Sequence, residues 1–80
     1  MVKSSIQNNI RTLRFHAGEM TQQELADQAG VSRQTIVAIE KGNYSPSLEL
    51  AFRLATIFRK PLEEVFIYDP DKGSPKKGSQ

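Results

Sequence analysis

The stretch Thr21–Lys41, TQQELADQAGVSRQTIVAIEK, decides the fold. Thr21 and Glu24 have the spacing of a capping box, in which the threonine hydroxyl and the glutamate carboxylate accept from amides at the start of a helix. Gly30 is expected to end that helix, because glycine takes the left-handed conformation without a Cβ clash. Ser32 can cap a second helix. The stretch therefore predicts two short helices joined by a tight turn.

The apolar residues are spaced so that these two helices can cross steeply. A steep crossing on a turn of about three to four residues needs a small residue at the contact. Ala26 lies four residues before Gly30, while Ile36 and Ile39 lie six and nine residues after it and can anchor the second helix. By itself this pattern suits any helical hairpin.

The motifs QQELA, GVSRQTI and IEKG follow in register, and with them the stretch resembles the helix-turn-helix of the phage repressor and Cro family, called the Cro/C1 or Xre type. The resemblance extends from about Ile10 to Phe66. It implies an all-α, five-helix, lambda-repressor-like DNA-binding domain in which the second and third helices form the helix-turn-helix.

The flanking sequence supplies three more helical patterns. Ser4 or Ser5 can cap a first helix that ends at Gly18, with an apolar stripe formed by Ile6, Ile10, Leu13 and Ala17. The link to the next helix is one residue longer than is common in the family, and we expect Met20 to point into the core.

Ser47 can cap a fourth helix, which we expect to be central because its apolar face is broad: Leu48, Leu50, Ala51, Leu54, Ala55, Ile57 and Phe58. Arg53 is expected on its solvated side. Pro61 suits the first turn of a fifth helix, with Leu62, Val65 and Phe66 directed inward.

Composition limits the class of protein. The 80 residues suffice for one small domain, expected at residues 1–68, and residues 69–80 have the polar composition of a disordered tail. No segment approaches the roughly 20 apolar residues that cross a membrane, and the first residues do not resemble a signal peptide, so we expect a cytoplasmic protein. With no cysteine and one histidine, no metal or cofactor is expected. The net charge of +2 does not by itself indicate a nucleic-acid partner.

In the resembling family, the second helix of the motif enters the major groove. Here Arg33 can bond guanine, Gln34 can bond adenine, and Val37 and Ala38 can touch a thymine methyl group. The alternative is that these side chains form a solvated helix face. Two further residues are expected near the DNA backbone, Ser32 and Thr35.

Backbone contacts are expected on both sides of the recognition helix. Gln22 matches a family glutamine that bonds a phosphate and buttresses that helix, and Gln23 could do likewise. Lys41, Asn43 and Tyr44 lie in the loop with which the family contacts the DNA backbone. The alternative is a solvated loop for Lys41 and Asn43, and core packing for Tyr44.

Other polar residues have structural explanations. Arg14 and Glu40 occupy the places where the family forms an ion pair that fixes geometry. His16 is expected on the surface. The adjacent Glu63 and Glu64 suit a helix start, and Ser32 has no base in prospect, so we expect no enzyme.

The sequence therefore predicts a regulator, most simply a repressor, that acts by occupying a double-stranded DNA operator. Because one helix reads few base pairs, a homodimer on a palindromic operator is expected. Phe66 should complete the core, leaving Ile67 and Tyr68 for the dimer interface, unless all three fold back onto their own subunit. We do not expect a ligand-sensing domain after Phe66, and therefore no small-molecule ligand. The alternative function is a protein-interaction module, such as an antitoxin-like partner or an adaptor.

Overall fold

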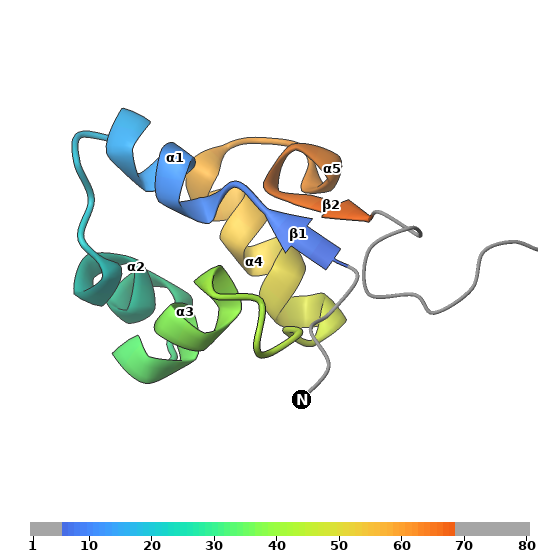
Figure 1. Ribbon diagram of the computed structural model, residues 1–80. Coiled ribbons are helices and arrows are strands. Elements are labelled where there is room, and N and C mark those ends of the chain that lie inside the picture. Colours follow the sequence, from blue (N-terminus) through green and yellow to red (C-terminus); the bar gives the residue numbers. More distant parts are fainter. Residues whose placement is uncertain (1–5, 69–80) are drawn as a thin grey trace, which may run out of the picture.

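The structure is a computed structural model that describes residues 6–68. Five helices form the bulk of this part, as predicted, and a small sheet is added to them (Figure 1). In chain order the elements are β1 (Ile6–Asn8), α1 (Ile10–His16), α2 (Gln22–Ala29), α3 (Arg33–Glu40), α4 (Leu48–Phe58), α5 (Leu62–Val65) and β2 (Phe66–Tyr68). The tail predicted at residues 69–80 lies outside the described residues.

The helix-turn-helix forms through the local signals seen in the sequence. The amide of Glu24 donates to Oγ1 of Thr21 at 3.0 Å, and the amide of Thr21 donates to Oε1 of Glu24 at 2.8 Å, which completes the capping box. Gly30 ends α2 with φ +75°. Ser32 then caps α3 by accepting from the amide of Thr35 at 3.2 Å.

The prediction of a first helix starting at Ser4 or Ser5 is wrong at its N-terminal end. Ile6–Asn8 is a strand, antiparallel to β2 in the register Ile6↔Tyr68, Gln7↔Ile67 and Asn8↔Phe66. The amide of Asn9 donates to the carbonyl of Val65 at 2.9 Å, and α1 begins only at Ile10. The backbone groups of β1 form hydrogen bonds with a segment close to 60 residues away in the sequence. The pattern of neighbouring residues cannot predict such pairing. Ser4 and Ser5 lie outside the described residues.

The core is built around α4, which runs through the middle of the molecule with α2 and α3 on one side and α5 on the other (Figure 1). The largest fully buried side chains come from every helix: Ile10, Leu25, Ile36, Ile39, Leu54 and Val65. Met20, Leu62 and Phe66 are partly buried and pack against this cluster, as expected.

One residue assigned to the apolar face of α4 is not part of the core. Leu48 is 70% exposed. It lies in the first turn, about a quarter turn from the centre of the buried stripe formed by Leu50, Ala51, Leu54, Ala55 and Phe58. None of the helices within residues 6–68 is long and apolar enough to cross a membrane.

Candidate nucleic-acid interface

The two faces of α3 differ sharply in burial. Ile36 and Ile39 are 0% and 2% exposed and anchor the helix on the core. Arg33 and Gln34, in the first turn, are exposed. The outward side of α3 therefore presents a guanidinium and an amide to solvent.

The remaining α3 candidates lie around these two side chains. Val37 and Ala38 are half-buried, one turn further along the outward face. Ser32 is exposed and Thr35 half-buried, and their hydroxyl oxygens are 3.0 Å apart in a hydrogen bond. All six candidates of this helix and its cap are thus grouped on or beside its outward face.

The two glutamines at the start of α2 have different surroundings. Gln22 is half-buried, and its Nε2 donates to Oε1 of Glu40, at the end of α3, at 3.2 Å. Gln23 is exposed and donates along its own helix to Oδ1 of Asp27 at 2.9 Å. Gln22 therefore buttresses α3, whereas Gln23 makes no such contact with it.

Arg14 and Glu40 form the ion pair expected from their positions. Nε of Arg14 lies 2.7 Å from Oε2 of Glu40, and its second guanidinium nitrogen donates to Oε1 at 3.2 Å. The guanidinium also donates to the carbonyl of Met20 at 2.8 Å. The side chains are only 15% and 11% exposed, so this bidentate ion pair is largely shielded from solvent. It joins α1, the α1–α2 link and α3.

The loop after α3 presents its polar residues outward. Lys41 and Asn43 are exposed, and the amide of Asn43 is held by the carbonyl of Ala38 at 3.0 Å. Gly42 between them has φ +79°, which turns the chain away from α3. Tyr44 is 49% exposed, so its alternative role as a core residue does not hold.

Two positioning contacts escaped the sequence analysis. Arg53, expected on the solvated side of α4, donates to the carbonyl of Ala29 at 2.7 Å and to Glu49 at 2.9 Å, so that it holds the end of α2. Asn8 donates to the carbonyl of Ile39 at 2.9 Å, at the end of α3. The spacing of Glu49 and Arg53 could have indicated their ion pair. The contacts with Ala29 and Ile39 arise from tertiary packing.

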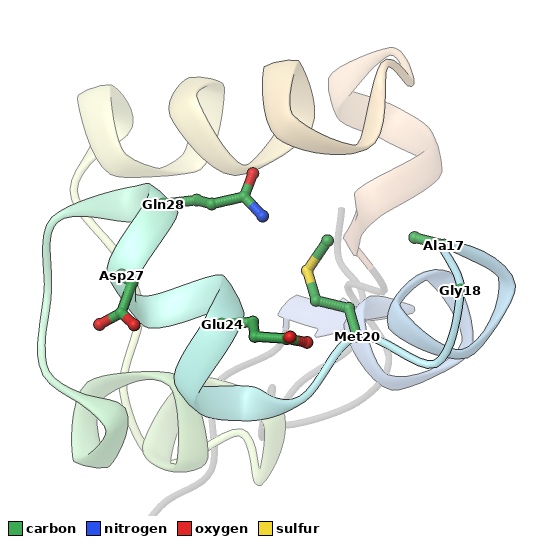
Figure 2. A pocket seen from close by; sticks show the side chains of 6 residues that line it. All are labelled: Ala17, Gly18, Met20, Glu24, Asp27 and Gln28. Atoms are coloured by element: carbon green, nitrogen blue, oxygen red, sulfur yellow. The ribbon is translucent and has the colours of Figure 1, made fainter.

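The surface also has an open hollow of about 450 Å³, lined by Ala17, Gly18, Met20, Glu24, Asp27 and Gln28. Figure 2 shows the side chains of Met20 and Gln28 directed toward the same open space, on the side of α2 away from α3. Glu24 and Asp27 give its rim negative charge, which disfavours phosphate. The side of α3 is therefore the better candidate for a DNA-facing surface.

Comparisons with known proteins identify the family. The family model described as helix-turn-helix matches residues 10–65. An uncharacterised HTH-type transcriptional regulator of Methanocaldococcus jannaschii is 57% identical over 53 residues, which cover 66% of this chain and 80% of that protein. Another, from Methanothermobacter thermautotrophicus, is 54% identical over 66 residues, covering 78% of this chain and 96% of the relative.

A solved structure shows the same fold. The restriction-modification controller protein C.AhdI from Aeromonas hydrophila is 31% identical, with a TM-score of 0.61, and the match covers 69% of this chain and 78% of that one. The match to the family model spans more than half of the chain and includes all five helices. The chain belongs to the helix-turn-helix family of the Cro/C1 (Xre) type, and it is a DNA-binding transcriptional regulator.

Proposed function

We propose that this protein recognises a specific operator by placing α3 in the major groove of duplex DNA, and that it represses transcription by occupying that site. The observation that carries the proposal is the exposure of Arg33 and Gln34 on a helix whose opposite face, Ile36 and Ile39, is buried. A helix anchored in this way can enter the groove without giving up its core contacts.

In this proposal, the outward face of α3 contacts the bases. The guanidinium of Arg33 suits O6 and N7 of guanine, and the amide of Gln34 suits N6 and N7 of adenine. Val37 and Ala38 are half-buried and offer small apolar surfaces for a thymine methyl group.

Contacts with the DNA backbone surround this reading face. The amide of Gln22 has two protons, and since Glu40 accepts one of them, the other can reach a phosphate while Gln22 still buttresses α3. The other backbone candidates are Gln23, Ser32, Thr35, Lys41, Asn43 and Tyr44. Contacts of this kind fix the register of the protein on DNA and carry no base information.

The active form in this proposal is a homodimer on a palindromic operator. Ile67 and Tyr68, which are adjacent on β2, are 42% and 66% exposed, so both side chains are available for an interface. Phe66 beside them is half-buried against the core. A two-fold axis near Ile67 and Tyr68 would give a self-complementary interface.

The protein would act in the cytoplasm, without catalysis and without a small-molecule ligand. Occupancy of DNA is itself sufficient to alter transcription, so abundance and dimerisation can set its effect.

In vitro selection of bound sequences from a random duplex library tests the proposal. We expect enrichment of one palindromic sequence and binding that weakens as salt rises. If no sequence is enriched at low salt, and a protein partner is bound with salt-independent affinity, the interaction-module alternative replaces it.

A further inference from the structure

Asn8 joins the sheet to the end of the recognition helix. Its Nδ2 donates to the carbonyl of Ile39 at 2.9 Å, and its Oδ1 accepts from the amide of Ile10 at 3.2 Å. Its main chain is paired with Phe66 in β2. One half-buried residue thus connects α3, α1 and the sheet.

The two partners determine which way the amide group of Asn8 points. The amide of Ile10 needs an acceptor, and the carbonyl of Ile39 needs a donor, so both ends of the Asn8 side chain are used. Aspartate has nearly the same shape, but an ionised carboxylate has no proton to donate. Asn8→Asp therefore keeps the contact with Ile10 and removes the contact with Ile39.

The Asn8 contact differs in kind from the other contacts at this end of α3. Arg14 and Gln22 hold the side chain of Glu40 from α1 and α2. Asn8 instead holds the main chain of Ile39, and it does so from β1. Because α3 has only eight residues, a contact at its last turn can change the orientation of the whole helix relative to the sheet.

We propose that Asn8 is a positioning residue for DNA binding, which sets the angle of α3 relative to the β1–β2 sheet. The inference rests on the proposed function, in which two copies associate at β2. The two copies of α3 must then fit half-sites about 34–36 Å apart. In such a dimer, β2 lies at the two-fold axis, β1 pairs with β2, and Asn8 of β1 donates the hydrogen bond to α3. Asn8 consequently governs the tolerance to half-site spacing, whereas Arg33 and Gln34 govern base preference.

The test compares Asn8→Asp with a matched control, Asn9→Asp. Asn9 is the neighbouring residue, and its Nδ2 also donates to a main-chain carbonyl, that of Glu64 at 3.0 Å, in α5 rather than α3. Three duplex probes are used: the sequence selected by the wild type, the same sequence with one base pair inserted between its half-sites, and a single half-site.

We expect Asn8→Asp to lower the preference for the selected spacing over the lengthened one by about two- to tenfold, the range of one neutral hydrogen bond. Its affinity for the single half-site should stay close to that of the wild type, and Asn9→Asp should keep the wild-type preference. An unchanged spacing preference in Asn8→Asp would overturn the positioning role. An equal loss on the single half-site, or the same loss in Asn9→Asp, would also overturn it.

A second measurement on the free protein separates this inference from the proposed function. Amide hydrogen exchange should become faster in Asn8→Asp at Lys41 and Gly42, whose amides close the last turn of α3, while the amides of α2 keep their protection. Asn9→Asp should leave both helices unchanged. If the wild type selects no duplex, the proposed function fails, and unchanged exchange in Asn8→Asp would overturn the positioning role separately.

Discussion

At the scale of single residues, the spacing predicts the helical phase of the motif, whereas tertiary contacts could be predicted only where the family resemblance implies them, as for Arg14 and Glu40. The spacing of Ile36 and Ile39 predicts Gln34 on the opposite face, and the burial of the two isoleucines agrees with it, whereas the outward position of Arg33 is what the family resemblance implies. Arg53 is exposed on the solvated side of α4, as expected, but its contact with the carbonyl of Ala29 could not be predicted, because that acceptor belongs to another helix. A pattern within one helix carries no information about a main-chain acceptor in its neighbour.

A substitution at Lys41 tests whether this residue contacts the DNA backbone or the bases. Lys41→Ala should weaken binding to all duplexes alike and reduce the slope of log affinity against log salt by about one, because one phosphate contact is lost. Titrations at several salt concentrations measure this slope. Lys60→Ala, in the link between α4 and α5, is the control that should leave the slope unchanged. A loss confined to one base position would show that Lys41 reads bases instead.

Arg59 is a residue in a strained backbone conformation. It ends α4 with φ +57°, in the left-handed region that disfavours residues with a Cβ. Arg59→Gly should therefore raise the free energy of unfolding by up to about 1 kcal/mol, as measured by urea denaturation. The neighbouring Lys60→Gly is the control, since Lys60 lacks a positive φ and should gain nothing. Equal effects of the two substitutions would show that the strain is not significant.

At the scale of elements, helices with local caps could be predicted, and the sheet could not. Thr21, Ser32 and Ser47 each accept an amide of their own first turn, so the starts of α2, α3 and α4 follow from neighbouring residues. β1 depends on pairing with β2 at the other end of the domain. Ile6 and Ile10 also lie four residues apart, which mimics a helical stripe, and this coincidence produced the error at the start of α1.

The central role of α4 gives a stability prediction with an internal control. Leu54 is 0% exposed, so Leu54→Ala should lower the free energy of unfolding by about 2–5 kcal/mol through lost burial and a cavity. Leu48→Ala, on the same helix but at a side chain that is 70% exposed, should change it by less than about 0.5 kcal/mol. Urea denaturation of both variants measures the difference. Similar losses in the two would contradict the assignment of the core to one face of α4.

At the scale of the whole molecule, the proposed dimerisation would determine how much sequence the protein can distinguish. One α3 reads only a few base pairs, and two copies related by a two-fold axis double that number. Sedimentation should show a wild-type dimer at tens of micromolar and a monomer for the double variant Ile67→Asp/Tyr68→Asp, because two carboxylates from each subunit would be buried together at the axis. Gln28→Asp, at an exposed position of α2, is a control for added charge and should leave the dimer intact. A monomeric wild type, both free and on a palindromic duplex, would remove the proposed interface.

The most direct test of base reading by α3 is the change in base preference when its outward side chains are truncated. Arg33→Ala and Gln34→Ala are each assayed against the selected operator and every single-base variant of it. We predict that each substitution costs about 1–3 kcal/mol at the selected operator and relaxes the preference at one base position per half-site, a different position for each. Unchanged base preference in both variants would show that another surface of the molecule reads the DNA.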